Sequence, residues 1–441
     1  MSENIKDICI YAKFFVPLHA NLCIMVNKLK IINDPVFGFL SIPNALVYDV
    51  LQHPYVQRLN RIRQLGLSYL VYPGAMHSRF GHSIGAMHLM QEAVTSLRMK
   101  GVEITDEEAT AAMIAILLHD IGHGPFSHVL EHTIVDGVTH EEISLLMMER
   151  INEDLHGQLN MAIAIFKNEY PKHFLHQLIS SQLDVDRMDY LCRDSFFTGV
   201  QEGRVASERL LKMLDVRNDK LVVQIKGIYS VEKFLVARRL MYWQVYLHKT
   251  SVAAEQHLIK ILSRAKEIAR RSTDRSADRI QKTDLFCSPA LRYFLYQNVT
   301  FDMFSPTSEA LEQYALLDDT DVLSAIKAWI SSEDKVLSVL SNAFINRQLF
   351  RGELIDEPLT EAQKQALNKE YAEHLGISET EAAYCWEEHV STSNTYSEKA
   401  DSIDILYSDG TVRDIAEASE ILDLEALTRK PIKRYLFRLR D

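Results

Sequence analysis

Three short segments of the chain concentrate the side chains that bind metal ions and phosphates. They span residues 77–83, residues 118–131 and residues 184–194, and together they are rich in histidine, aspartate and arginine. Imidazole nitrogens and carboxylate oxygens without thiolates suit a divalent ion such as Mg, Mn, Fe, Zn or Ni. One ion needs about four to six ligands, so more than one segment must contribute to the site.

The dipeptide His119-Asp120 lies where an apolar run ends. Adjacent helical residues point about 100° apart, but unwinding toward Gly122 lets both side chains converge on one ion. A bare imidazole or carboxylate in such a core position is costly unless it is paired or binds a metal. The best further ligand candidates are His82, which opens an apolar helix, and Asp186, which lies in an Asp-rich helical stripe.

A purely structural interpretation competes with the metal site. A buried histidine beside an aspartate is most often a hydrogen-bonded pair, residues 184–194 alone also fit a charged helix face, and Arg79 alone fits an ion pair. The dipeptide gains weight because His123, His128 and Glu131 follow within a dozen residues. We therefore favour a metal and phosphate site over isolated structural pairs.

Helices must position most of these side chains. Thr105 and Thr139 fit as N-caps, because acidic residues lie in the first helical turn after each of them. The spacing of apolar residues predicts helices over residues 47–64, 83–99, 106–119, 140–151, 174–194 and 231–271, the last of them broken or bent.

Strand signals are few and short. Residues 37–42 and 221–226 predict strands, and the alternation within residues 403–415 predicts a hairpin around a Ser-Asp-Gly turn. Residues 435–439 are a candidate third strand for that hairpin, and residues 285–390 are helical with polar turns. The expected fold class is mostly α, with a small α+β appendage at the C-terminus.

The composition is that of a globular protein and excludes a mainly disordered or collagen-like chain. The 441 residues are 47% hydrophobic and 24% charged, with a net charge of −12. This negative charge does not favour binding to nucleic acid or to an anionic membrane, and we expect neither as a partner. The five cysteines form no CxxC pair, which fits a reducing compartment, so we expect a cytoplasmic protein.

The beginning of the chain differs from the rest. Residues 8–26 are rather apolar, but polar residues interrupt them and acidic residues precede them, where a secretory signal carries basic ones. We expect residues 1–24 to be an extension without a role in catalysis. Residues 25–275 are then the catalytic core, and residues 276–441 a C-terminal helical and small β region.

Numerous ordered motifs run from about residue 34 to residue 271. They are Gln57-Arg58-Leu59, Gln64-Leu65-Gly66, Tyr72-Pro73-Gly74-Ala75, His77 with Arg79-Phe80 and His82-Ser83, Leu118-His119-Asp120, Gly122-His123-Gly124-Pro125-Phe126-Ser127-His128, Thr139-His140-Glu141, Asp184-Val185-Asp186, Asp189-Tyr190, Arg193-Asp194, and Tyr246 with His248-Lys249. In these motifs the chain resembles the HD-domain metal-dependent phosphohydrolases, and within them the deoxynucleoside triphosphate triphosphohydrolases.

The resemblance implies a helical HD-domain core and a role for each matching residue. The implied metal ligands are His82, His119, Asp120 and Asp186. The implied catalytic residues around the phosphates are His123, His128, Glu131 and His140, with His128 in the position of proton transfer. The implied substrate contacts are Gln64, Leu65, Arg79, Arg187, Tyr190, Asp194, Arg238 and Tyr246.

The implied reaction is hydrolysis of a deoxynucleoside triphosphate to deoxynucleoside and inorganic triphosphate. Arginines and protonated histidines can neutralise the phosphates, while the metal acts as a Lewis acid. Two alternatives are an HD phosphohydrolase for a nucleoside monophosphate, cyclic nucleotide or alarmone, and a nucleotide sensor without catalysis. Tyr190 and Asp194 fit a 3′-hydroxyl, and the extra histidines fit a long phosphate chain, so the triphosphate reaction is favoured.

The resemblance also implies a homo-oligomer, either a dimer or a tetramer, and a nucleotide activator. Mammalian members of the family read a guanine nucleotide with an acidic residue before the first-motif proline and a nearby arginine. Here Gln52 and His53 precede Pro54, and Asn60 stands in place of the arginine. Activation is therefore either lost or directed at a different base.

Overall fold

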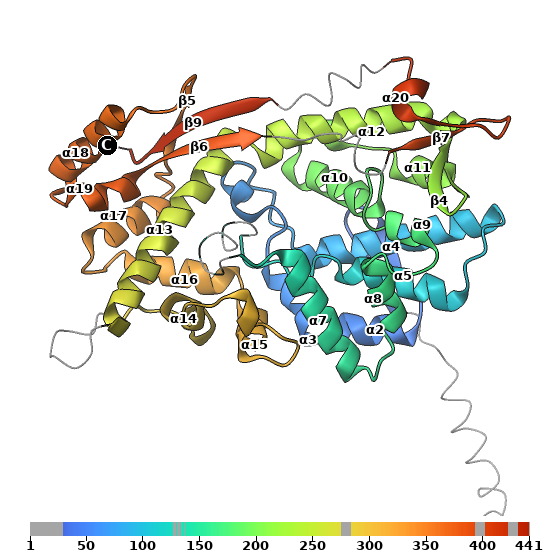
Figure 1. The fold of residues 1–441 in the computed structure, drawn as a ribbon, viewed down its shortest axis with the longest axis horizontal. Helices are drawn as coiled ribbons and strands as arrows, with labels where there is room; N and C mark the ends of the chain where they lie inside the picture. The colour runs from blue at the N-terminus through green and yellow to red at the C-terminus, as the bar shows by residue number, and fades with distance from the viewer. Residues whose placement is uncertain are drawn as a thin grey trace, which may run out of the picture.

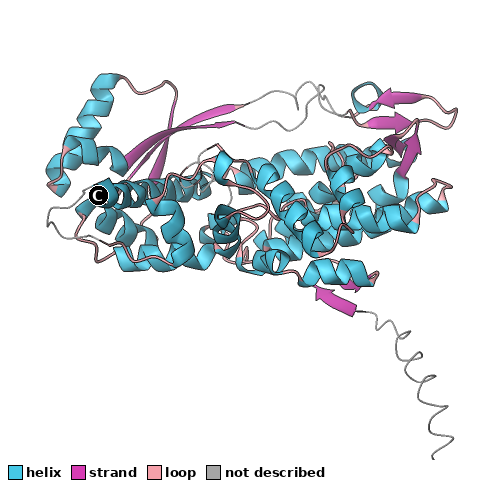
Figure 2. Ribbon diagram, turned by 60° about the horizontal axis from the view of Figure 1, so that its bottom comes forward, coloured by secondary structure: helices cyan, strands magenta, loops and turns pink. Residues whose placement is uncertain are grey.

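The computed structural model describes residues 30–126, 129, 133, 135, 137–274, 284–392, 402–421 and 431–440 (Figure 1). The fold is mostly α, as predicted. The helices form an elongated body with a small β-sheet near each of its two ends, and a separate β-hairpin stands apart from both sheets (Figure 2). The expected extension of residues 1–24 lies outside the described residues.

Three helices form the centre of the N-terminal part of the molecule. They are α4 (Arg79–Met99), α5 (Asp106–Leu118) and α10 (Val185–Thr198), and α4 packs against the other two. The apolar residues of α5 are buried almost throughout, so both sides of that helix face protein. The chemistry-bearing ends of all three helices therefore meet inside the core.

The two predicted N-caps are confirmed. Thr105 accepts from the backbone N–H of Glu108 at the start of α5, and Thr139 does the same with Glu142 at the start of α7 (His140–Asp154). Each glutamate reaches back to the backbone of its threonine and completes a capping box.

Two predicted helices are shorter than the sequence indicated. Residues 47–64 are divided into α2 (Ala45–Gln52), α3 (Pro54–Gln57) and the 3₁₀ helix η1 (Arg58–Arg61). His53 is extended there, because a residue before proline is pushed out of the helical region. Residues 174–194 are likewise divided into α9 (His173–Gln177) and α10, since Asp184 is extended and its side chain caps α10.

The predicted break within residues 231–271 is confirmed. The segment consists of α12 (Ile228–Met241), a π-helical turn η5 (Tyr242–Tyr246) and α13 (Lys249–Asp274). The wide turn is closed by the N–H of Leu247, which donates to the carbonyl of Tyr242 at 2.7 Å. Such π turns inside helical segments occur frequently at functional sites.

The strands form three small sheets. The hairpin is β1 (Lys30–Asp34) with β2 (Gly38–Ile42), and the four-stranded sheet has the order β3 (Leu214–Arg217), β4 (Lys220–Gln224), β7 (Asp404–Leu406), β8 (Val412–Asp414). The predicted hairpin within residues 403–415 is therefore confirmed, and β7 pairs in parallel with β4.

The prediction of a third hairpin strand at residues 435–439 is wrong. Strand β9 (Ile432–Arg438) lies instead between β5 (Arg351–Ile355) and β6 (Trp386–Thr392). The reason is side-chain packing: the fully buried Phe437 ring occupies the space above Gly352, where an added Cβ would lie 2.5 Å from the ring.

The remaining helices are α8 (Asn160–Phe166), α11 (Ser207–Met213), α14 (Pro289–Tyr296), α15 (Glu309–Leu316), α16 (Asp319–Trp329), α17 (Lys335–Ile345), α18 (Glu361–Leu375), α19 (Glu379–Ala382) and α20 (Ile415–Ala418), with the 3₁₀ helices η2 (Gly66–Leu70), η3 (Gln201–Gly203), η4 (Ile225–Gly227), η6 (Phe301–Met303) and η7 (Ala383–Cys385). Within the described ranges, no helix has both the length and the apolar character needed to cross a membrane.

Candidate active site

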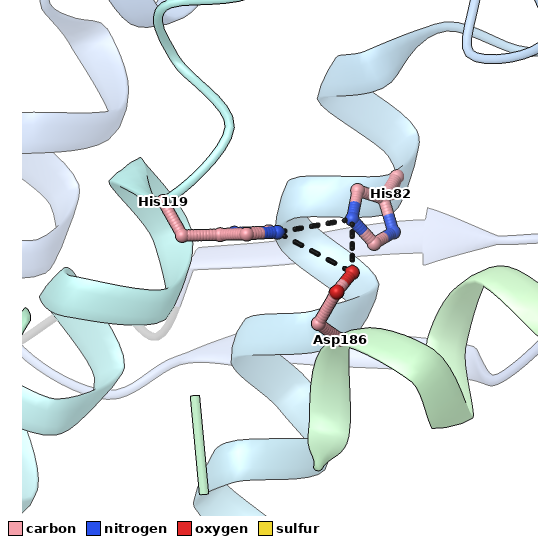
Figure 3. A group of neighbouring side chains, drawn as sticks. All are labelled: His82, His119 and Asp186. Atoms are coloured by element: carbon pink, nitrogen blue, oxygen red, sulfur yellow. Dashed lines mark hydrogen bonds and ion pairs between the residues drawn. The ribbon is translucent and has the colours of Figure 1, made fainter. Parts of the chain in front are cut away.

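Two imidazoles and one carboxylate meet where α4, α5 and α10 converge (Figure 3). The Nε2 atom of His82 lies 3.4 Å from Nε2 of His119 and 3.2 Å from Oδ1 of Asp186. Nε2 of His119 lies 3.4 Å from the same carboxylate oxygen. The three candidate ligand atoms thus form a compact triangle, although their residues are distant in the sequence.

Asp120 adds a second carboxylate to this triangle. Its Oδ1 lies 3.4 Å from Nε2 of His119, and its Oδ2 lies 3.9 Å from Nε2 of His82. Arg79 donates from Nη1 to Oδ2 of Asp120 at 2.6 Å. All four predicted ligands therefore lie together, and we call His82, His119, Asp120 and Asp186 the His/Asp group.

Each imidazole of the His/Asp group is oriented through its other nitrogen. Nδ1 of His82 lies 2.7 Å from Oδ2 of Asp189, and the guanidinium of Arg193 donates to both oxygens of that carboxylate at 2.9 Å. Arg193 in turn donates to Asp34 at 2.7 Å. Nδ1 of His119 lies 2.6 Å from the carbonyl of Ile116, which it reaches as a donor. Both Nε2 atoms are thereby aimed at the same point, as in protein sites for divalent ions.

Charge within the His/Asp group is strongly coupled. Burial opposes a proton on His82, but Asp186 and Asp189 outweigh burial and raise the pKa of His82 to about 10. Burial alone raises the pKa of Asp186, yet the two histidines lower it below its usual value. A divalent ion that binds here must therefore displace a firmly held proton.

The turn that follows His119 is held in a narrow geometry. The hydroxyl of Ser144 donates to the carbonyl of His119 and accepts from the N–H of Gly122, both at 2.9 Å. A Cβ at Gly122 would lie 2.2 Å from the carbonyl oxygen of His140, so only glycine fits. This close approach explains the glycine in the motif and brings α7 beside the His/Asp group.

Two more predicted histidines stack beside Asp120. The ring centroids of His123 and His140 are 3.9 Å apart, and Nε2 of His123 lies 3.5 Å from Oδ1 of Asp120. Burial, together with the charge of Arg79, lowers the pKa of His123 to about 3. His123 is therefore a neutral imidazole here, whereas the sequence suggested protonated histidines. The predicted residues His128 and Glu131 lie outside the described residues.

A cavity of about 370 Å³ opens beside the His/Asp group. Six predicted substrate contacts line it, namely Gln64, Leu65, Arg79, Tyr190, Asp194 and Tyr246. Asp194 is fixed in its wall by two bonds of 2.8 Å, one accepted from the Tyr246 hydroxyl and one shared with Nε2 of His77. The volume and the mixed lining are those of a small-molecule site.

Two predicted phosphate contacts do not line this cavity. Arg187 forms an ion pair with Asp184, and Arg238 donates to Oε1 of Gln182 at 3.0 Å. Both Nε atoms are buried without a hydrogen-bond partner in the described part of the chain.

Several residues that the structure places at the site have no predicted role. Asp189 and Arg193 orient His82, and their spacing after Asp186 could have shown it, because residues three and four apart share one face of a helix. Phe126, Tyr242, Leu247 and Glu255 complete much of the cavity wall together with Gly66 and Ser68. Gly66 and Phe126 lie within the sequence motifs, but no local signal marks the other four, because tertiary packing brings them to the cavity.

Comparisons with known proteins agree with this arrangement. The chain matches the family model of the HD domain over residues 79–194 and that of the HD associated region over residues 205–293. A solved structure of a phosphohydrolase from Bacteroides thetaiotaomicron is 55% identical, covers 94% of this chain and 100% of that chain, and has a TM-score of 0.89.

Two curated relatives extend the comparison. The uncharacterized protein YwfO of Bacillus subtilis is 36% identical over 333 residues, which are 74% of this chain and 72% of that protein. A deoxynucleoside triphosphate triphosphohydrolase SAMHD1 homolog of Dictyostelium discoideum is 32% identical over 246 residues, which are 51% of this chain and 47% of that protein. The second match therefore spans about half of each chain.

Proposed function

The chain belongs to the HD-domain phosphohydrolases, and from this membership we propose that it hydrolyses deoxynucleoside triphosphates to deoxynucleoside and inorganic triphosphate. The observation that carries the proposal is the position of Arg79. Its side chain lines the cavity and also donates to Asp120 of the His/Asp group. A ligand whose phosphates meet Arg79 would therefore present them to that group.

The cavity offers both a polar carboxylate and an apolar ring surface, which supports a nucleoside beside those phosphates. Asp194, held by Tyr246 and His77, offers carboxylate oxygens to a sugar hydroxyl. The ring of Tyr190 packs edge-on against Tyr246, with centroids 5.9 Å apart, and supplies an apolar surface for the sugar. We propose that Gln64 and Leu65 contact the base and sugar from the other wall.

The residues of the His/Asp group fit a divalent ion, because two oriented imidazoles and two carboxylates converge without a thiolate. Such an ion would polarise a phosphate oxygen as a Lewis acid. Arg79 would neutralise phosphate charge, and the neutral imidazole of His123 would contact the phosphates by hydrogen bonding instead of by charge. His140, His128 and Glu131 stay proposed phosphate or proton-transfer residues, and Arg187 and Arg238 stay proposed phosphate contacts.

Product analysis tests the proposal. Purified protein is incubated with each dNTP and NTP in Mg²⁺ or Mn²⁺, with and without GTP or dGTP, and the phosphorus products are identified by ³¹P NMR. We expect deoxynucleoside and triphosphate from dNTPs, and no turnover by an Asp186→Ala variant. The guanine-nucleotide arms test the predicted activator, and gel filtration in the same buffers tests the predicted oligomer.

Other outcomes would redirect the proposal. Release of pyrophosphate or single phosphate would contradict the proposed products. Equal turnover of NTPs would contradict a deoxynucleoside preference. If no triphosphate is hydrolysed under any condition, the substrate is another phosphoester, and nucleoside monophosphates, cyclic nucleotides and alarmones are then assayed with the same variant as control.

A further inference from the structure

The start of α16 brings two neighbouring carboxylates against the N-terminal part of the molecule. Asp318 and Asp319 lie outside both segments that match the family models. Asp319 is 4% exposed, and its Oδ2 accepts from the backbone N–H of Arg63 at 3.1 Å and from Nη1 of Arg63 at 3.2 Å. A side chain of the C-terminal region thus binds main chain more than 250 residues away in the sequence.

The segment that Asp319 holds forms one wall of the cavity. Arg63 is followed directly by Gln64 and Leu65, both of which line the cavity. The guanidinium of Arg63 also lies over the ring of Tyr69, 4.6 Å from its centroid. Arg63 is therefore held through both its backbone and its side chain. These contacts also restrict the positions of Gln64 and Leu65, which follow it directly.

The same carboxylate faces a second wall of the cavity. The backbone N–H of Phe126 lowers the pKa of Asp319, although Oδ1 of Asp319 has no hydrogen-bond partner among the described residues. Phe126 lines the cavity and has a φ of 55°, a conformation that costs a non-glycine residue about 1–2 kcal/mol. Strained backbone of this kind persists only where surrounding contacts hold it.

Keeping Asp319 charged in this place is costly. Burial raises the pKa of Asp319 to about 6, although Arg63 and the N–H of Phe126 act in the opposite direction. A buried carboxylate contributes little net stability even when it is paired. Its two bonds to Arg63, which directly precedes the cavity residues Gln64 and Leu65, give it a role that stability alone does not.

We propose that Asp319 is a positioning residue for substrate binding, whose carboxylate holds the Arg63–Leu65 wall of the cavity in place. The proposal rests on the assignment of this cavity as the substrate site. Within the described part of the chain, Asp319 forms no hydrogen bond or ion pair with the His/Asp group, so we expect it to act on substrate binding and not on metal binding.

Asp318 provides a matched control on the same helix end. It pairs with Arg61 at 2.5 Å, but Arg61 is half exposed and does not line the cavity. Asp318 also caps α16, and asparagine is an equally good N-cap. Asp318→Asn therefore removes a neighbouring charge and ion pair without touching a cavity wall.

The first test is steady-state kinetics with dATP and Mn²⁺ on the full chain. Asp319→Asn should raise KM about tenfold while kcat changes less than about threefold, because a charged hydrogen-bonding anchor is lost only from the binding walls. Asp318→Asn should leave both constants unchanged. A fall in kcat without a change in KM, or equal effects of the two variants, would overturn the proposal.

The second test needs no substrate and separates this inference from the proposed function. Hydrogen–deuterium exchange should accelerate in the peptide containing Arg63 in Asp319→Asn but not in Asp318→Asn. Unchanged exchange would overturn the positioning role even if dATP is hydrolysed. A wild type that hydrolyses no dNTP would refute the proposed function, while the exchange result would still decide the role of Asp319.

A third variant covers the case in which Asp319→Asn does not fold. Arg63 is partly exposed, so Arg63→Gln should be tolerated. It removes the ion pair but keeps the backbone bond to Asp319, and we expect a KM rise of about threefold at unchanged kcat. No change in KM would count against the proposal.

Discussion

The His/Asp group and the cavity beside it are built in different ways. In the group, the Nδ1 atom of each imidazole has its own hydrogen-bond partner. For His82, successive hydrogen bonds run from Asp189 to Arg193 and on to Asp34. In the cavity, by contrast, the walls come from many segments, and two arginines expected at the phosphates are turned toward Asp184 and Gln182. The imidazoles of the His/Asp group are thus already oriented by hydrogen bonds, whereas the shape of the cavity depends on the packing of distant segments.

This difference implies that variants in the two regions should separate by the constant they change. A lost ligand or ligand support removes metal affinity and turnover. A lost cavity contact weakens substrate binding and leaves the chemistry in place. The following variants test this separation, beginning with the largest expected effect.

Asp186→Ala should abolish turnover. It removes the carboxylate whose Oδ1 lies within 3.4 Å of the Nε2 atoms of both His82 and His119. We expect a loss of more than about 100-fold in kcat/KM at saturating Mn²⁺, with an unchanged far-UV circular dichroism spectrum. Wild-type turnover by the folded variant would remove Asp186 from the site.

Asp189→Asn should weaken metal binding by about 10- to 100-fold, the range for partners that orient a histidine ligand. The asparagine keeps the shape of the side chain but replaces the charged hydrogen bond to Nδ1 of His82 with a neutral, weaker one. Titration with Mn²⁺ followed by electron paramagnetic resonance measures the affinity. Recovery of kcat at high Mn²⁺ is expected, and a loss of kcat that Mn²⁺ cannot restore would contradict an orienting role.

Tyr246→Phe should raise KM for dNTPs about fivefold with little change in kcat. The change removes the hydroxyl that fixes Asp194 and leaves the ring in the cavity wall. Tyr229→Phe, at an exposed tyrosine, is the control. If kcat fell and KM stayed constant, Asp194 would act in catalysis and not in substrate binding.

Thr105→Ala should have the smallest effect on catalysis. It removes the N-cap of α5, the helix whose opposite end carries His119. Loss of a cap costs about 1 kcal/mol of the free energy of unfolding. We expect a lower midpoint in urea denaturation at unchanged kcat and KM, whereas a large drop in kcat would show that the His/Asp group is not rigidly held.

The same contrast explains what the sequence could predict. The four residues of the His/Asp group were found because each lies in a short motif near a helix end. The pairing of Arg187 with Asp184 and of Arg238 with Gln182 was not found, because competition for a cation is decided in three dimensions. The role of Asp319 was hidden for the same reason.

The fold shows a similar limit. The N-caps at Thr105 and Thr139 and the hairpin within residues 403–415 are local, and they were predicted correctly. The partner of β9 was predicted wrongly, since alternation identifies a strand but does not identify its neighbours. The break at Pro54 was missed although the proline itself signals it.

We propose that the His/Asp group binds one divalent ion, which displaces the proton from His82, whose pKa is raised to about 10 by Asp186 and Asp189. Calorimetric titration of EDTA-treated protein with Mn²⁺ between pH 6.5 and pH 9 tests it directly. Because the protonated form of His82 dominates below that pKa, and the pKa of His119 is also raised, apparent affinity should rise at least about tenfold per pH unit, with one ion bound per chain. Absence of binding, affinity independent of pH, or equal binding by Asp186→Ala would contradict the account.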